Sequence, residues 1–469
     1  MASAVVTFLP ERLREIFARR IDLFRASSWV VVAYVLQQVL RLIVNIVLAA
    51  LLAPALLGTM LLINTLRTAG ELLTDVGIGQ SIVHNPRGDE RDFLNTAWTI
   101  QILRGVLLFA VSLLFVAPLA DLYDEPQLNS LLPVAALLFL IAGFTSPSKF
   151  VLQKQVRTRE LASYTLWTNA AGAIVTVALA WWLRDIWALI YGLLAGLSIT
   201  VIASFFLLDW RMHRLKWDRS AAKAILKFGK WIFFSSLIYF AASNFDRLYL
   251  ADAVPFAVLG VYGIARTYAD TALNLFVQVC SQIVFPKISS SAKRGMDLAA
   301  SIAPMRRAAL LLVALGLGAG VAIADQFILI AYDERYVAAA AYLPILMLGA
   351  WFGTMAAISE SVLMGIGKPS NVALGNAAKF ASVLAVVPLI LPGYGMIAAV
   401  MAFSAVELVR YAVLAWRMAV HRIHFVRQDA LATMVFIAAI VAFREIGALI
   451  GVTGDTASLI ASTGALLGQ

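Results

Sequence analysis

Apolar segments long enough to cross a lipid bilayer recur along the whole chain, and no other feature constrains the fold as much. Each segment holds about twenty residues with few charges, and a helix of that length spans the ~30 Å hydrocarbon core of a membrane. Hydrophobic residues make up 62% of the chain and charged residues only 14%, whereas about a quarter of a soluble domain is charged. The sequence therefore excludes a soluble globular protein and predicts an all-α integral membrane protein.

The apolar segments predict about twelve core transmembrane helices. The expected spans are residues 27–52, 56–83, 93–118, 128–148, 161–183, 186–210, 231–251, 256–285, 308–328, 338–366, 371–391 and 395–418. An apolar tail follows from about residue 429 to 467 and adds one or two helices, so a total of fourteen is the upper expectation.

Positive charge is concentrated in alternate loops between these spans. With the N-terminus inside, the cytoplasmic loops hold most of the lysines and arginines that flank the spans: Arg87, Arg91, Lys149, Lys154, Arg157, Arg159, Arg211, Arg214, Lys216, Arg219, Lys223, Lys227, Lys230, Lys287, Lys293, Arg294, Arg306, Arg307, Lys368, Arg417, Arg422 and Arg427. The opposite loops hold almost none, with Arg184 and Arg335 as the exceptions. Because positively charged loops remain in the cytoplasm, we expect a multi-pass protein of the bacterial inner membrane with a cytoplasmic N-terminus. The net charge of +10 is thus distributed by topology, which argues against a nucleic-acid partner.

The residues before the first span have an amphipathic pattern. Residues 10–26 (PERLREIFARRIDLFRA) place Leu13, Phe17 and Phe24 near one helical face and arginines on the others. This pattern predicts an interfacial helix on the cytoplasmic leaflet, and a frayed basic tail is the alternative.

The two halves of the chain carry traces of an internal duplication. Two short segments return 202 residues later: Ala55–Gly58 and Gln80–Val83 match Ala257–Gly260 and Gln282–Phe285. The same shift carries Arg104 onto Arg306. A repeat of six spans predicts two pseudo-symmetric six-helix lobes, related by an axis along the membrane normal and separated by a cleft. The expected parts are an N-terminal interfacial segment (1–26), an N-lobe (27–210), a basic cytoplasmic linker (211–230), a C-lobe (231–420) and an accessory hydrophobic segment (421–469).

Several motifs in both halves resemble a known transporter family. They are Leu52–Gly58 (LAPALLG), Asp75–Gln80 (DVGIGQ) and Thr96–Arg104 (TAWTIQILR) in the first half, and Asp246–Leu250 (DRLYL), Leu259–Gly263 (LGVYG) and Phe285–Pro286 in the second. Over roughly residues 27–420 the chain resembles the polysaccharide transport (oligosaccharide flippase) family of the multidrug/oligosaccharidyl-lipid/polysaccharide flippase superfamily. The pattern consists of small, apolar and turn residues, so it specifies the superfamily better than the substrate.

The resemblance implies a function and a set of partners. A V-shaped pair of lobes would carry an undecaprenyl-pyrophosphate-linked oligosaccharide, such as an exopolysaccharide or O-antigen repeat unit, from the cytoplasmic to the periplasmic leaflet by alternating access. The implied partners are this lipid-linked anionic oligosaccharide, membrane lipids, and polysaccharide polymerase or export proteins. Relatives couple transport to an ion gradient, and no motif in this chain assigns the ion.

Charged residues inside the predicted spans are the candidate site residues. A charge at membrane depth costs ~3 kcal/mol or more, so it faces a cavity or a partner. Four cations have an acidic neighbour on the same helix: Arg67 with Glu71, Arg266 with Asp270, Arg410 with Glu407, and Arg247 with Asp246. Such pairs either neutralise each other in the bundle or serve transport. In the second case the cations bind substrate, and the candidate coupling carboxylates are Glu71, Asp75, Asp246, Asp270 and Glu407.

Three further cations, Arg41, Arg104 and Lys379, lack such a local partner. Guanidinium groups suit phosphate oxygens, so we hypothesise that these cations line the cleft and hold the pyrophosphate, with Arg104 and Arg306 at its cytoplasmic mouth. Cross-helix salt bridges or snorkelling to the headgroups are the alternatives. Three polar residues are expected to extend a hydrophilic wall: Gln38 and Asn45, which share a helical face with Arg41, and Asn244.

The sequence supports other functions less well. It contains no catalytic signature, no phosphate-binding GxxxxGKS/T segment, and no metal-ligand set beyond His421 and His424. We therefore expect a transporter rather than an enzyme, with neither a cofactor nor a metal. A cation-coupled multidrug antiporter of the same superfamily is the main alternative, and it would favour an acid-dominated aromatic cavity. A membrane glycosyltransferase or polymerase would need a large periplasmic loop, and the predicted outer loops are short.

Overall fold

The computed structural model describes residues 32–209, 213–293 and 298–454, so the expected interfacial segment 1–26 lies outside the described residues. Regular structure within these ranges is entirely helical, which confirms the predicted all-α class. The chain divides into two compact units. Unit 1 comprises Met1–Leu52 and Arg67–Phe234, and unit 2 comprises Ala53–Leu66 and Ser235–Gln469.

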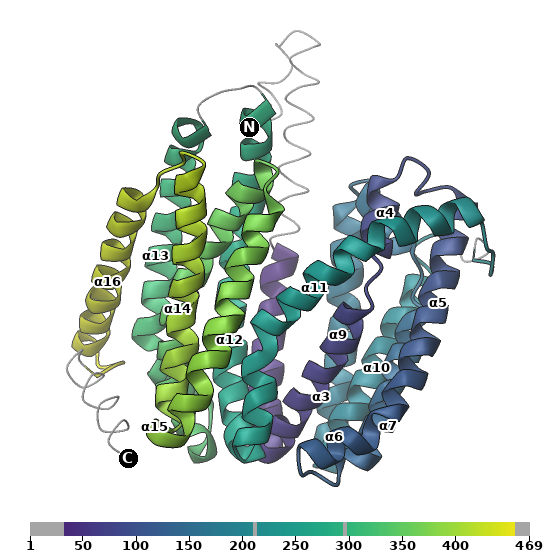
Figure 1. Ribbon diagram of the computed structural model, residues 1–469. Helices are drawn as coiled ribbons and strands as arrows, with labels where there is room; N and C mark the ends of the chain where they lie inside the picture. The colour runs from purple at the N-terminus through teal and green to yellow at the C-terminus, as the bar shows by residue number, and fades with distance from the viewer. Residues whose placement is uncertain (1–31, 210–212, 294–297, 455–469) are drawn as a thin grey trace, which may run out of the picture. The chain divides into compact units, whose positions relative to one another are not determined.

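Unit 1 is built from helices that pack mainly on their neighbours in the chain (Figure 1). They are the helix Val32–Leu51, the end of α3 (Pro54–Leu73), α4 (Ile78–His84), α5 (Arg91–Leu114), α6 (Val116–Leu122), α7 (Leu128–Gly143), α8 (Ser148–Lys154), α9 (Thr158–Leu183), α10 (Ile186–Ser204) and the beginning of α11 (Arg219–Ala253). Small residues allow the close contacts between them. A Cβ atom on Gly172 of α9 would lie 3.0 Å from the Cα of Gly196 in α10.

The predicted continuous span at 56–83 is wrong, because the helix breaks between Leu73 and Ile78. The backbone at Gly77 has a φ of 63°, in the left-handed region that favours glycine. The Asp75 carboxylate accepts a hydrogen bond from the Gly77 N–H at 2.8 Å, which stabilises the turn. The chain therefore leaves α3 and starts the short helix α4.

The predicted span at 128–148 also breaks, between α7 and α8, where the chain bends by 52°. The connection contains Pro147, which has no N–H to donate and disfavours helical geometry at the preceding Ser146. The Ser146 and Ser148 side chains hydrogen-bond to each other at 2.6 Å within the connection. Two helices of unit 1 are thus discontinuous.

Unit 2 is a bundle around α14. Its helices are the start of α3, the end of α11, α12 (Phe256–Lys293), α13 (Leu298–Ala331), the 3₁₀ turn η3 (Glu334–Tyr336), α14 (Val337–Gly365), α15 (Pro369–Val420) and α16 (Val426–Leu449). α14 packs against α12, α13 and α15, and most of its residues are buried. Figure 1 shows α13, α14, α15 and α16 side by side in green to yellow. α15 contains both predicted spans 371–391 and 395–418, separated by a sharp turn at Gly395, where φ is 77°.

Repeat-related residues contact each other within unit 2. A Cβ atom on Gly58 of α3 would lie 1.9 Å from the carbonyl oxygen of Phe256, and one on Gly260 of α12 would lie 1.9 Å from the carbonyl oxygen of Pro54. Gly58 and Gly260 are 202 residues apart, as are Pro54 and Phe256. The two contacts are therefore equivalent under the duplication, and only glycine permits this backbone approach.

The C-terminal helix α16 is bound to α13 by two buried ion pairs. Arg306 of α13, which is 0% exposed, pairs with Asp429 at 2.5 Å. Arg444, which is 2% exposed, donates to both carboxylate oxygens of Asp325 at 2.6 and 2.8 Å. Arg444 lies inside α16, so the first helix of the apolar tail continues through this residue. α16 is an integral part of unit 2.

Eight described helices are long and apolar enough to cross a membrane, or nine if the bent pair α7 and α8 is counted as one span. α15 carries two of the predicted spans, and α3, α11 and α12 contain charged residues that lower their hydropathy. The chain is a multi-pass membrane protein, and twelve to fourteen helices stays a prediction.

Candidate functional site

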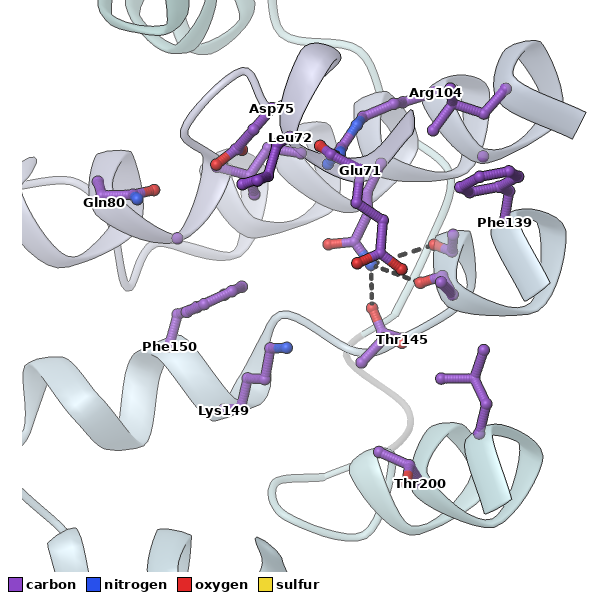
Figure 2. Close-up of a pocket in the computed structure, with 18 of the residues that line it drawn as sticks. Glu71, Leu72, Asp75, Gln80, Arg104, Phe139, Thr145, Lys149, Phe150 and Thr200 are labelled. Carbon is purple, nitrogen blue, oxygen red and sulfur yellow. Dashed lines mark hydrogen bonds between the residues drawn. The ribbon is translucent and has the colours of Figure 1, made fainter. Parts of the chain in front are cut away.

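A polar cavity of about 590 Å³ lies inside unit 1, at the two discontinuous helices (Figure 2). Its lining residues come from the end of α3, from α4, α5, α7, α8 and α10, and from the connections between them: Glu71, Leu72, Asp75, Ile78, Gly79, Gln80, Val83, His84, Gln101, Arg104, Gly105, Leu108, Phe139, Ala142, Gly143, Thr145, Lys149, Phe150, Gln153, Leu197 and Thr200. Non-helical backbone is tolerated at membrane depth where it is buried in protein or lines a cavity. Residues at both helix breaks therefore line the same cavity.

Two side chains of α5 bind the helix ends at these breaks. Arg104 donates from Nε to the Thr74 hydroxyl at 2.9 Å and from a terminal nitrogen to the carbonyl oxygen of Glu71, in the last turn of α3. Gln101, one turn earlier, donates from Nε2 to the carbonyl oxygens of Ala142, Gly143 and Thr145 at 3.1, 3.2 and 2.8 Å. These carbonyls lie in or just beyond the last turns of α3 and α7, where the regular helical donors end. α5 thus stabilises the C-terminal ends of both α3 and α7.

The cavity contains two carboxylates that already have partners. Glu71 forms an ion pair with Arg67 at 3.0 Å, as the sequence predicts. Asp75 accepts the hydrogen bond from Gly77 that holds the turn before α4. Both predicted coupling carboxylates of the first half therefore lie in one cavity with Arg104.

Lys149 is the cavity cation with the most freedom to bind a ligand. It lies in the first turn of α8, and Figure 2 shows its side chain extending toward the open space near Thr145. Its ammonium group is 4.8 Å from the centre of the Phe150 ring. Among the described residues, no carboxylate lies within ion-pair distance of Lys149. An ammonium group in such surroundings attracts an anion.

The rest of the lining combines hydrogen-bonding and aromatic side chains. Amide and hydroxyl groups come from Gln80, Gln101, Gln153, Thr145 and Thr200. Phe139 and Phe150 add two aromatic rings, which Figure 2 places at different sides of the opening. The cavity can therefore offer hydrogen bonds to hydroxyl groups and apolar contact to ring faces.

The predicted cations of the second half form a charge network in unit 2. Arg266 of α12 pairs with Asp246 at 3.4 Å and with Asp270 at 3.0 Å, and Arg247 of α11 pairs with Asp270 at 2.5 Å. Asn244 accepts a hydrogen bond from Arg247 at 3.1 Å, so this residue supports the network.

The network continues on α14 and α15. Lys379 pairs with Glu407 at 2.5 Å, and Arg410 pairs with Glu407 at 3.4 Å and with Glu360 at 2.6 Å. The sequence suggests no local partner for Lys379, and its partner Glu407 lies beyond the turn at Gly395 on the same bent helix, α15. The four cations and four carboxylates of the network balance, and each cation is neutralised.

The remaining predicted site residues lie elsewhere. Arg41 occupies the middle of the helix Val32–Leu51 with an exposed side chain, and it has no ion pair or hydrogen bond with another described residue. Gln38 and Asn45 are half-buried on the same helix. Arg306, in unit 2, is paired with Asp429 and donates to Gln428 at 2.9 Å.

Sequence reasoning missed three important polar residues. The sequence predicts Lys149 in a cytoplasmic loop, because it directly follows the predicted span 128–148. Gln101 was not singled out, although it lies one turn from Arg104 within an apolar segment. Glu360 was also available as a lone acid in the predicted span 338–366.

The helical bundles, the discontinuous helices and the polar cavity define a multi-pass membrane transporter fold. A family model described as polysaccharide biosynthesis protein matches residues 47–341, so the chain belongs to this family. The teichuronic acid biosynthesis protein TuaB of Bacillus subtilis is 24% identical over 307 residues, which are 64% of this chain and 62% of TuaB. The match thus spans less than two thirds of this curated relative.

Solved structures of two transporters share the fold. The lipid II flippase MurJ, in an inward closed conformation, superposes with a TM-score of 0.70 at 12% identity, covering 89% of this chain and 98% of MurJ. An inward-facing multidrug resistance MATE family transporter of the MOP superfamily superposes with a TM-score of 0.63 at 13% identity, covering 82% of this chain and 95% of the transporter. At these identities the likeness shows the fold alone. The family is thus a polysaccharide biosynthesis family, as the sequence predicts, and the fold is shared with these two transporters.

Proposed function

We propose that this protein carries an undecaprenyl-pyrophosphate-linked oligosaccharide, such as an exopolysaccharide or O-antigen repeat unit, from the cytoplasmic to the periplasmic leaflet of the bacterial inner membrane by alternating access. The N-terminus lies in the cytoplasm. In this proposal the protein binds and releases its substrate without chemical change, and it acts beside polymerase or export proteins that use the product.

One observation carries the proposal: two discontinuous helices open onto a cavity that contains Lys149, a cation with no carboxylate within ion-pair distance among the described residues. In this assignment Lys149 and Arg104 contact the pyrophosphate oxygens, and Arg41 contacts the substrate from the helix Val32–Leu51. The amide and hydroxyl side chains of the cavity bind sugar hydroxyls. Glu71 and Asp75 are the proposed coupling carboxylates.

The cations of the unit 2 network have a different role in this proposal. Arg247, Arg266, Lys379 and Arg410 already have carboxylate partners. Removing a carboxylate from such a buried pair leaves an uncompensated charge, which is strongly destabilising. We therefore assign these four cations to the framework of unit 2 rather than to phosphate binding.

The test replaces Lys149 and follows export of the surface glycan in a strain lacking the wild-type protein. We expect Lys149→Gln to lower export about tenfold or more, because a charge-assisted hydrogen bond contributes roughly 1.5–3 kcal/mol. Undecaprenyl-linked repeat units should accumulate on the cytoplasmic face, and the amount of protein in the membrane should not change. Lys149→Arg should restore much of the export.

Lys223→Gln is the matched control, since Lys223 is exposed at the start of α11 and lines no part of the cavity. Full export by Lys149→Gln would contradict the site assignment. A deletion strain with normal glycan export and altered drug resistance would contradict the proposed function. That result would favour a cation-coupled antiporter, which the carboxylates Glu71 and Asp75 in the cavity also fit.

A further inference from the structure

A second hollow lies in unit 2, between the N-terminal parts of α13 and α16. Its volume is about 970 Å³. Its lining includes the basic residues Arg307, His424 and Arg427 and the apolar residues Leu311, Leu431 and Val435. None of them lines the cavity of unit 1. We call this hollow the α13–α16 groove.

The groove has a basic end and an apolar end. α13 and α16 run parallel, because Arg306 pairs with Asp429 near their starts and Asp325 pairs with Arg444 further along both helices. Arg307, His424 and Arg427 therefore lie at one level, at the beginning of α16. The apolar side chains Leu310, Leu311, Leu431 and Val435 follow in the next turns of the two helices.

The apolar end is open to the surroundings of the protein. Leu311 is 38% exposed and Leu431 is 60% exposed. Exposed aliphatic side chains on a transmembrane helix contact lipid chains, so a hydrocarbon chain can enter this part of the groove laterally.

The basic end carries positive charge that none of the described residues neutralises. Arg307 and Arg427 are exposed, and neither has an ion pair or hydrogen bond with another described residue. No carboxylate lines the groove. The neighbouring Asp429 is buried and bound by Arg306 and by the Tyr411 hydroxyl, the latter at 2.6 Å.

Arg427 also occupies an unfavourable position for a helix. It lies in the first turn of α16, where the peptide dipoles already give a positive potential. A cation there is destabilised unless an anion binds, so the helix end and the two arginines together favour a negatively charged group.

We propose that the α13–α16 groove binds an anionic phospholipid of the bilayer. The phosphodiester headgroup contacts Arg307 and Arg427, and one acyl chain lies along Leu311, Leu431 and Val435. Basic pockets between transmembrane helices on the cytoplasmic side are a known basis for binding anionic headgroups. The occupant matches the groove in both of its parts, charged at one end and apolar at the other.

The experiment measures lipid binding to the purified full-length protein by native mass spectrometry. The probes are phosphatidylglycerol, phosphatidylethanolamine and undecaprenyl phosphate. We expect preferential binding of phosphatidylglycerol. Each of Arg307→Gln and Arg427→Gln should weaken it about fivefold, and the double variant about thirtyfold, the effect expected for one or two basic residues at a membrane surface.

The matched control is the double variant Lys223→Gln and Lys368→Gln, which loses the same net charge at exposed positions outside the groove. Its binding of phosphatidylglycerol should stay within about twofold of wild type. Equal binding of phosphatidylglycerol and phosphatidylethanolamine would overturn the proposal, as would wild-type affinity in the arginine double variant. Stronger binding of undecaprenyl phosphate at this groove would also overturn it, since the groove would then hold a polyprenyl lipid.

Discussion

At the scale of single residues, the role of a charged side chain inside a membrane segment depends on the groups that it contacts. Arg104 and Lys149 line the same cavity, but Arg104 is held by the end of α3, whereas Lys149 lies near the Phe150 ring and has no ion pair with another described residue. Lys379 has a carboxylate partner on the same bent helix, α15. Sequence alone identifies such charges, because they are rare in apolar segments, but their partners come from other turns and helices.

Arg104 is therefore expected to contribute to stability as well as to transport. Arg104→Gln removes the donors that satisfy the Glu71 carbonyl and the Thr74 hydroxyl, and an unsatisfied buried group costs about 1–3 kcal/mol. We expect a lower melting temperature and less protein in the membrane, together with lost export. Lys149→Gln should leave the melting temperature unchanged, which separates the two residues. Equal melting temperatures for wild type and Arg104→Gln would contradict the capping role.

Arg41 provides the complementary case. Its side chain is exposed and has no partner among the described residues, so Arg41→Ala should leave the amount of membrane protein unchanged. If Arg41 binds the substrate, the variant should abolish export of the surface glycan, and Arg41→Lys should recover part of it. Export assays with quantification of membrane protein test both points. Full export by Arg41→Ala would exclude a substrate role for this residue.

At the scale of helices, small residues and breaks determine how the elements meet. The α3–α4 and α7–α8 breaks were not predicted, because hydropathy remains high across them and hides the turn at Gly77 and the bend at Pro147. The turn at Gly395 was predicted, because Pro392 and glycine there interrupt an otherwise continuous apolar segment. Hydropathy thus locates the segments, and turn residues decide whether each segment is one helix.

The contact between α3 and α12 gives a direct test of this view. Gly260→Val would place side-chain atoms on the carbonyl of Pro54, where a Cβ alone is already 1.9 Å away, and backbone cannot move aside as a flexible side chain can. We expect a fall in stability of at least about 3 kcal/mol, seen as loss of monodisperse protein and of the thermal transition. Gly393→Val is the control, since nothing lies within 4 Å of a Cβ there. Similar losses in both variants would contradict the packing role.

At the scale of the whole molecule, the sequence predicts the class, the repeat and the set of membrane-embedded charges. The helical class follows from the apolar segments, and the family follows from the motifs of small residues. Both features are local in the sequence. The set of residues that line the cavity could not be predicted. It depends on which helix ends the α5 side chains Arg104 and Gln101 bind, and these ends belong to α3 and α7. The segment 211–230 was expected to be a linker, and within it α11 already begins at Arg219.

The described part of this segment packs along the start of α5. The N–H groups of Arg214, Lys216 and Asp218 donate to the side chains of Asn95, Thr99 and Thr96, respectively. Hydrogen bonds from the backbone and hydroxyl of Ser220 hold the pKa of the Asp218 carboxyl below its usual value of 3.8, and Arg87 adds to this shift. A depressed pKa means that the ionised carboxylate stabilises the folded arrangement above pH 3.8, and that this contribution is lost as the pH falls further.

We therefore expect the attachment of this segment to weaken in acid. Hydrogen exchange at the amides of residues 214, 216 and 218, corrected for intrinsic rates, should be a few-fold faster at pH 3 than at pH 6. Asp218→Asn should already exchange faster at pH 6 and should respond little to acidification. Unchanged protection of the wild-type segment between these pH values would contradict the expectation.

The paired glycine contact between α3 and α12 has a consequence for how such a chain can diverge. After a gene duplication, most positions of the two copies are free to change separately. Gly58 and Gly260 occupy equivalent positions in the predicted duplication and lie against each other's backbone, so each copy supplies the opening into which the other fits. Selection therefore acts on the two positions together, because a substitution in either half disrupts the same backbone contact between α3 and α12. We expect natural variation in related sequences to be lowest here, even where the rest of the two halves no longer resemble each other.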